Sequence, residues 1–258
     1  MSILKTDHIT IKFGGLVAVE DFNIEINQGE LWAIIGPNGA GKTTVYNMIT
    51  GIYPPTEGEI YVCGQNMAGK KPFEFARAGV ARTFQNIRLF GKSSVLDNVK
   101  MAYTKDIDYN YKDMLFRTKK YHAEENRITE DAMNLLELFG LADKKDYFAT
   151  QLPYGEQRKL EIVRALATKP KLLLLDEPAA GMSPGEIDDV MALIHRVHDE
   201  MEQTILMIEH HMKLVMGVAE RIKVLEFGRT IAEGTPDEIQ KNPLVIAAYL
   251  GGDPDAHA

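Results

Sequence analysis

The segment from Gly36 to Thr43 constrains the fold more than any other part of the chain. It reads Gly-Pro-Asn-Gly-Ala-Gly-Lys-Thr and matches the pattern G-x-x-x-x-G-K-[ST] of phosphate-binding loops. Such a loop needs a buried strand before it and a helix after it. The run from Leu31 to Ile35 is continuously apolar, which is typical of a buried strand, and Gly51 ends the helical segment that follows. We therefore predict a strand–loop–helix unit that binds nucleotide phosphates.

The residue types of this loop assign roles to its members. Glycines let backbone N–H groups turn toward phosphate oxygens, and the helix N-terminus adds partial positive charge. The ammonium of Lys42 can reach the β- and γ-phosphates, and the hydroxyl of Thr43 can bind Mg²⁺. The predicted nucleotide-binding residues of this segment are Gly36, Pro37, Asn38, Gly39, Ala40, Gly41, Lys42, Thr43 and Thr44.

A second apolar run, from Leu172 to Leu175, ends in the adjacent acids Asp176 and Glu177. Taken alone, this pattern is equally typical of a strand that ends in solvated carboxylates. Beside a phosphate loop it indicates a metal and water site instead. We expect Asp176 to hold Mg²⁺ through water and Glu177 to polarise the water that attacks the γ-phosphate.

The order of patterns along the chain predicts an α/β fold. Alternating segments at Ile9–Phe13 and Phe22–Ile26 indicate early antiparallel strands, and later strands alternate with helices, which indicates a mostly parallel sheet. From about Asn86 the apolar runs become sparse, and we expect an inserted, mainly helical subdomain. The predicted division of the single domain 1–258 is a core of residues 1–85 and 157–250, a helical subdomain 86–156 and a flexible tail 251–258.

Composition narrows the setting in which the chain works. The 258 residues carry a net charge of −8 without a dense Lys/Arg block, so we expect no nucleic-acid partner. The only cysteine, Cys63, excludes an internal disulfide. The longest apolar runs are too short to span a bilayer, and the segment Met1–Lys5 lacks a signal-peptide pattern. We expect a cytoplasmic protein that reaches any membrane process by docking onto another protein.

These motifs, in their order, resemble the ATP-binding subunits of ABC transporters, and the resemblance extends from Leu4 to about Leu250. It implies a P-loop NTPase cassette with a RecA-like, mostly parallel core, an N-terminal antiparallel β subdomain and an inserted helical signature subdomain. ATP and Mg²⁺ are the implied cofactors. The implied catalytic residues are Lys42, Glu177 and His210, and the implied Mg²⁺ ligands are Thr43, Gln85 and Asp176.

Three single residues take their roles from this resemblance. Gln85 matches the glutamine that touches Mg²⁺ and senses the membrane partner. His210, after Glu209, matches the switch histidine that contacts the γ-phosphate. Phe13 matches the aromatic residue that stacks on adenine. The resemblance therefore implies that the nucleotide site draws on segments far apart in the sequence.

Two loops match segments that act across a dimer, and both depart from the usual pattern. Pro153, Tyr154, Gly155 and Glu156 fall in the signature loop, where the family usually has serine at the first of these positions, glycine at the second and glutamine at the fourth. Ser183 stands in the cross-dimer loop where aspartate is usual. Proline offers neither a hydroxyl nor an N–H. These departures put the efficiency of hydrolysis in doubt but not the nucleotide site.

Longer phrases resemble one branch of the family, the branched-chain amino acid importers: Ala81–Phe90, Glu177–Pro184, Ile208–Met212 and Val245–Gly251. This resemblance implies a second ATP-binding subunit, either a paralogue or a second copy, and two membrane permeases. It also implies an indirect partner, a substrate-binding protein, and a place on the inner face of the cell membrane. The ATPase of lipopolysaccharide export shares much of the pattern and remains the alternative transporter.

Two other classes of function stay open at this stage. A soluble ABC protein of DNA repair or translation usually carries two cassettes or a long coiled coil, whereas this chain has one phosphate loop and no heptad run. A nucleotide-binding regulator without turnover often loses the catalytic base, whereas Glu177 is present. The substituted signature loop keeps the second class open, because site residues rather than fold decide activity.

Overall fold

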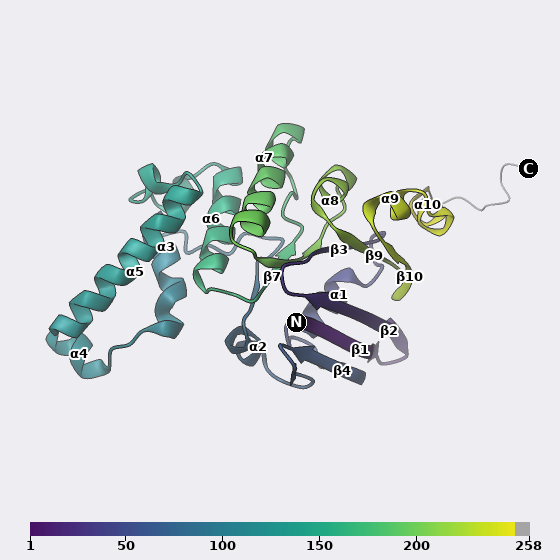
Figure 1. Cartoon of the computed structure of the whole chain (residues 1–258), viewed down its shortest axis with the longest axis horizontal. Helices are drawn as coiled ribbons and strands as arrows, with labels where there is room; N and C mark the ends of the chain where they lie inside the picture. Colours follow the sequence, from purple (N-terminus) through teal and green to yellow (C-terminus); the bar gives the residue numbers. More distant parts are fainter. Residues whose placement is uncertain (251–258) are drawn as a thin grey trace, which may run out of the picture. The chain divides into compact units, whose positions relative to one another are not determined.

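A computed structural model describes residues 1–250, apart from the side chains of residues 105, 106 and 250. The chain forms two compact units, Met1–Arg82 with the chain from Lys171 onward, and Thr83–Pro170 (Figure 1). The second unit includes the whole signature segment, whereas the predicted helical subdomain spanned residues 86–156. The predicted flexible tail, 251–258, lies outside the described residues.

The first unit opens with an antiparallel sheet in the strand order β2-β1-β4-β5. Its strands are β1 (Ser2–Phe13), β2 (Leu16–Asn27), β4 (Glu57–Val62) and β5 (Gln65–Asn66). Buried and exposed residues alternate along much of β2, because one face of the sheet packs on the core and the other meets solvent. This sheet confirms the predicted N-terminal antiparallel subdomain.

The second sheet of this unit has the order β10-β9-β3-β8-β7-β6. Five strands run parallel: β6 (Val80–Arg82), β7 (Leu172–Asp176), β3 (Leu31–Ile35), β8 (Thr204–Ile208) and β9 (Arg221–Glu226). Only β10 (Arg229–Gly234) is antiparallel, and it forms a hairpin with β9. Every residue of β3, β7 and β8 is buried, which explains their continuous apolar runs. Their carboxyl ends meet at one edge, where α/β sheets bind ligands.

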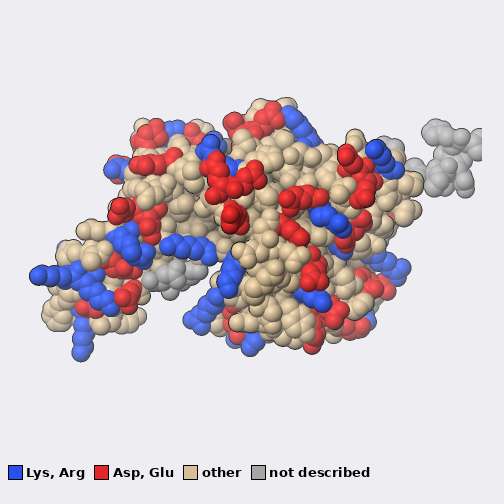
Figure 2. All heavy atoms as spheres, viewed as in Figure 1, with Lys and Arg blue, Asp and Glu red and all other residues tan. Residues whose placement is uncertain are grey.

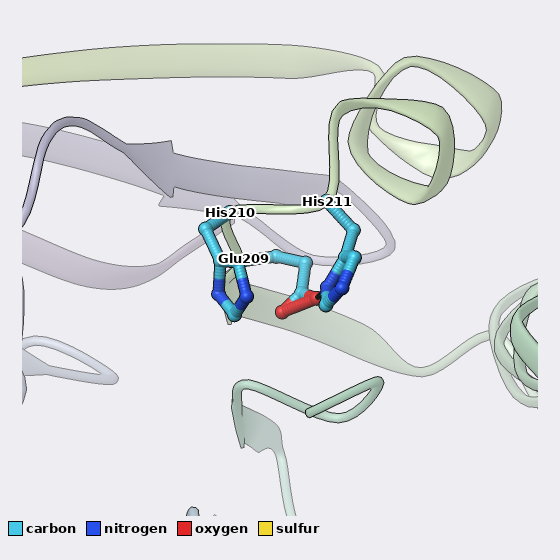
Figure 3. A group of neighbouring side chains, drawn as sticks. All are labelled: Glu209, His210 and His211. Atoms are coloured by element: carbon cyan, nitrogen blue, oxygen red, sulfur yellow. Dashed lines mark hydrogen bonds and ion pairs between the residues drawn. The ribbon is translucent and has the colours of Figure 1, made fainter. Parts of the chain in front are cut away.

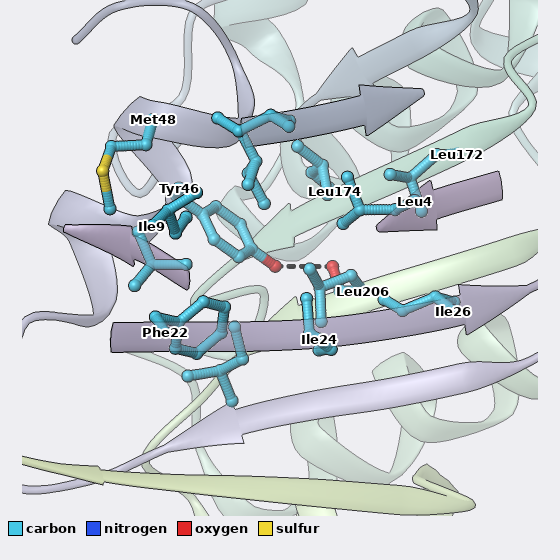
Figure 4. Packing of buried hydrophobic residues seen from close by; sticks show 14 of the residues in the cluster. Leu4, Ile9, Phe22, Ile24, Ile26, Tyr46, Met48, Leu172, Leu174 and Leu206 are labelled. Carbon is cyan, nitrogen blue, oxygen red and sulfur yellow. Dashed lines mark hydrogen bonds between the residues drawn. The ribbon is translucent and has the colours of Figure 1, made fainter. Parts of the chain in front are cut away.

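Helices of the first unit pack around this sheet: α1 (Lys42–Ile49), α2 (Pro72–Ala78), α7 (Pro184–His195), α8 (Met212–Val218), α9 (Pro236–Gln240) and α10 (Pro243–Leu250). Tyr46 of α1 is fully buried, and its hydroxyl donates a hydrogen bond of 2.5 Å to the carbonyl of Leu206 on β8 (Figure 4). This bond anchors the helix that follows the phosphate loop to the strand beneath it.

The second unit is built from helices, as expected: α3 (Val95–Lys100), α4 (Tyr111–Phe116), α5 (Lys119–Leu138) and α6 (Tyr154–Ala167). Helix α3 packs against both α5 and α6. None of the helices in the described part of the chain is long and apolar enough to cross a membrane. Figure 2 shows acidic and basic side chains mixed over the face that it draws.

Candidate nucleotide site and signature helix

The phosphate loop joins β3 to α1, so the strand–loop–helix context that the motif requires is present. Gly41 has a φ of 101°, a left-handed conformation that side-chain-bearing residues rarely adopt. A Cβ at Gly36 would lie 2.1 Å from the carbonyl oxygen of Leu225, so only glycine fits there. The loop is therefore held in a tight turn whose backbone can approach a phosphate closely.

Lys42 is buried at the first position of α1, and its ammonium donates to two loop carbonyls. Its Nζ lies 2.7 Å from the oxygen of Gly36 and 2.9 Å from that of Pro37. Burial lowers the pKa of Lys42, and the charge of Glu177 partly opposes that shift. A phosphate would supply anionic acceptors to this desolvated ammonium, so the residues present fit the γ-phosphate of a nucleotide.

A cavity of about 370 Å³ opens beside the loop, within the first unit. The loop residues Asn38–Thr44 line it, as does Glu177. The lining is completed by four residues whose place there no sequence motif predicts: Leu16, Val17, Ala18 and Phe227. The volume and the convergence of backbone donors, an ammonium and a carboxylate are typical of a small-molecule site.

Phe13 is not among the residues that line this cavity. Its ring packs edge-to-face on Tyr53 with centroids 5.4 Å apart. Phe13 pairs with Leu16 across the turn between β1 and β2, and Leu16 does line the cavity. The stacking of adenine on Phe13 therefore stays a prediction, whereas Leu16 and Phe227 are apolar side chains that do line the cavity.

Asp176 ends β7 and is buried. The Nη2 atom of Arg82 lies 2.6 Å from its Oδ2, and both side chains are less than one-tenth exposed. Arg82 also donates to the side-chain oxygen of Asn47 on α1, at 2.9 Å. Carboxylate and hydroxyl oxygens are the ligands that Mg²⁺ prefers, so Asp176 and Thr43 fit the predicted metal. Arg82, which the site prediction left out, positions this carboxylate.

Glu177 follows at the edge of the sheet with an unusual backbone. Its φ is 47°, a conformation that is uncommon outside glycine and that clusters at functional sites. Its N–H donates to the carbonyl of Ile208 at 2.9 Å, which ties the turn to β8. The Oε2 of Glu177 lies 3.7 Å from Nδ1 of His210. The structure thus brings together the predicted base and the predicted switch histidine.

Three consecutive residues form a cluster after β8 (Figure 3). Glu209 is fully buried, and its Oε1 lies 2.6 Å from Nδ1 of His211. Burial raises the pKa of Glu209, while the hydrogen bond from His211 opposes that shift. The rings of His210 and His211 lie with centroids 4.2 Å apart. Neither Glu209 nor His211 has a role that the sequence predicts.

The signature residues begin helix α6 in the second unit. Pro153 is the N-cap residue of this helix, with a φ of −54° and no side-chain hydrogen bond to the helix. Glu156, in the first turn, pairs with the ammonium of Lys144 at 2.5 Å. Ser183 lies in the first unit, where its side chain and that of Glu186 cap the N-terminus of α7. Ser183 therefore has a capping role besides its predicted cross-dimer role.

Gln85 belongs to the second unit, where Arg158 of α6 holds its backbone. The guanidinium of Arg158 donates to the carbonyls of Phe84 at 2.6 Å and of Gln85 at 2.7 Å. It also pairs with Glu161 at 2.8 Å, and both side chains are buried. The structure thereby ties the Gln85 segment to the signature helix. The metal contact predicted for Gln85 stays a prediction.

Comparisons with known proteins agree with this geometry. The family model of the ABC transporter matches residues 19–180, and that of the branched-chain amino acid ATP-binding cassette transporter matches residues 229–255. The branched-chain amino acid transport ATP-binding protein BraF of Pseudomonas aeruginosa is 44% identical over 96% of this chain and 98% of its own length. The corresponding LivG protein of Escherichia coli is 42% identical over the same shares.

A solved structure extends the likeness to the fold. An ATP-binding cassette of an ABC transporter, determined in its ADP conformation, superposes with a TM-score of 0.84 and 33% identity. The match covers 98% of this chain and 100% of the cassette. Phosphate loop, acidic strand end and signature helix thus occur together in one recognisable architecture. The chain belongs to the family of ABC transporter ATP-binding subunits, which bind ATP and couple its hydrolysis to transport.

Proposed function

We propose that this chain hydrolyses Mg-ATP as one half of a head-to-tail pair of cassettes that powers import of branched-chain amino acids. The observation that carries the ATPase step is the cavity at the phosphate loop, which Lys42 and Glu177 both line. The likeness to BraF and LivG along nearly the whole chain supports the proposal that the transporter is an importer of branched-chain amino acids. The separate match of residues 229–255 to the importer model points the same way.

The residues of the first unit divide the chemistry among them. Loop N–H groups and Lys42 bind the β- and γ-phosphates and stabilise charge on the transferred phosphoryl group. Glu177 orients the attacking water and accepts its proton, and His210, 3.7 Å away, contacts the γ-phosphate. Thr43 and Asp176 would hold Mg²⁺, which would supply charge neutralisation when bound.

Pairing of two cassettes links this chemistry to transport. The N-terminus of α6, with Pro153 and Gly155, would face the γ-phosphate held by the other cassette. ATP then binds the closed pair better than the open one and shifts the population toward closure. The segment from Gln85 to Phe90 would carry this motion to a permease on the inner face of the membrane.

Uptake of radiolabelled leucine tests the proposal. Cells that lack this gene receive either the wild-type chain or the Lys42→Ala chain at matched expression, and glutamate uptake serves as the control solute. We expect the wild type alone to restore leucine uptake, with glutamate uptake equal in both strains. Equal leucine uptake in the two strains would contradict the proposal.

A further inference from the structure

The cluster Glu209–His211 contains three potential metal ligands. Each residue offers one ligand atom, and these atoms all lie within 4.8 Å of one another. Imidazole nitrogens together with a carboxylate oxygen are the ligand set of borderline divalent ions such as Zn²⁺. Mg²⁺ prefers oxygen ligands alone, so the ion predicted at the phosphate loop is a poor match for this cluster.

The carboxylate of Glu209 provides an independent reason to expect a cation. Its side chain is 0% exposed, and its Oε1 accepts from His211. Its Oε2 is buried and has no hydrogen-bond partner among the described residues. A buried, unpartnered oxygen of a carboxylate is costly. The ligand atoms of all three side chains lie close together (Figure 3), so an ion bound among them would satisfy this oxygen.

The geometry needs only a small adjustment to close around an ion. Ligand atoms about 2.0–2.1 Å from a tetrahedral Zn²⁺ are roughly 3.4 Å apart. The side chain of His210 is 46% exposed and can rotate toward its neighbours, whereas Glu209 is held by its burial. Three protein ligands leave a fourth position for water, which is typical of sites that are not purely structural.

We propose that Glu209, His210 and His211 bind one transition-metal ion of the Zn²⁺ class, and that this ion inhibits ATP hydrolysis. Binding would hold His210 at the cluster and away from Glu177, which now lies 3.7 Å from it. The inhibitory part rests on the proposed role of His210, whereas the binding part stands without it. Metal binding would then couple the turnover of the cassette to the availability of such ions.

The first experiment measures metal binding without nucleotide. Zn²⁺ is titrated into the full-length chain against a chromophoric chelator, with wild type, His211→Gln, His211→Ala and the exposed control His122→Ala. The glutamine keeps a donor for Glu209, which protects the fold from an unpaired buried carboxylate. We expect one tight site in the wild type and the control, and at least tenfold weaker binding in both His211 variants. Affinity unchanged in both variants would overturn the proposal.

The second experiment measures ATP turnover at saturating Mg-ATP while Zn²⁺ is raised. We expect Zn²⁺ to inhibit the wild type, and the His211→Gln chain to retain basal turnover while needing at least tenfold more Zn²⁺. Tight Zn²⁺ binding without inhibition of ATP turnover would overturn the proposal that the ion inhibits hydrolysis, while the proposed metal site would still hold. A wild-type chain without turnover even in the absence of Zn²⁺ would instead contradict the proposed function, because the binding result is independent of it.

Discussion

Replacing Arg158 with methionine should destabilise the second unit by about 3–5 kcal/mol, the typical cost of breaking a buried ion pair. The guanidinium is fully buried and pairs with Glu161, which is 1% exposed, at 2.8 Å. Methionine leaves that carboxylate buried without its countercharge. It also removes the two hydrogen bonds that the guanidinium donates to the carbonyls of Phe84 and Gln85. These costs overlap, because one side chain serves all three acceptors.

Hydrogen exchange followed by mass spectrometry measures the loss of stability within the second unit. Because about 1.4 kcal/mol corresponds to a factor of ten, a cost of about 3–5 kcal/mol should make peptides from residues 83–170 exchange roughly 10²- to 4 × 10³-fold faster. Arg127→Met is the matched control, since its ion pairs are partly exposed and should contribute about 0–1 kcal/mol. Adding Glu161→Gln to Arg158→Met should recover much of the loss. A loss below about 1 kcal/mol for Arg158→Met would refute the reasoning.

Three further predictions address nucleotide binding, the dimer and pH. Lys42→Ala should abolish the thermal stabilisation by Mg-ATP, because the loop loses its buried ammonium; stabilisation equal to wild type would show that the loop is misassigned. Pro153→Ser should raise the ATP-dependent dimer fraction in sizing chromatography of the Glu177→Gln chain, because a serine hydroxyl can donate to the partner-bound γ-phosphate; equal fractions would show that this position is not limiting. Burial raises the pKa of Glu233, but its ion pairs, chiefly with Lys223, outweigh burial and hold the pKa below 4.5. The stabilisation by these ion pairs is present above pH 4.5 and is lost as the pH falls through the lowered pKa of Glu233. Glu233→Gln should therefore reduce the loss of unfolding free energy on going to acidic pH. An unchanged loss would contradict this role of Glu233.

The nucleotide loop could be predicted from the sequence because its signal is local. Glycines at required spacings, an apolar strand before Gly36 and a helix from Lys42 all lie within one short segment. The acids Asp176 and Glu177 were predictable for the same reason, because they directly follow the continuous apolar run of a buried strand. The alternation of strands and helices indicated that the sheet is mostly parallel, but it did not indicate the order of the strands within the sheet.

Residues that act through tertiary contacts could not be predicted in this way. Arg158 and Glu161 read as an ordinary helical charge pair, because only the fold reveals that both are buried. Arg82 gave no sign that it reaches Asp176, which is 94 residues away. Phe227 lines the cavity from the turn between β9 and β10, and a lone aromatic residue in a turn carries no local signal for a ligand. These contacts depend on pairings between segments that are distant in sequence.

The central claim is that Glu177 activates the water that hydrolyses ATP, and the steady-state turnover of Glu177→Gln tests it most directly. The amide keeps the size of the side chain but cannot accept the proton, so turnover should fall by about 10²- to 10⁴-fold. ATP affinity, measured on the same preparation, should match the wild type because Lys42 and the loop are intact. Turnover equal to wild type would contradict the account and assign the base to another residue.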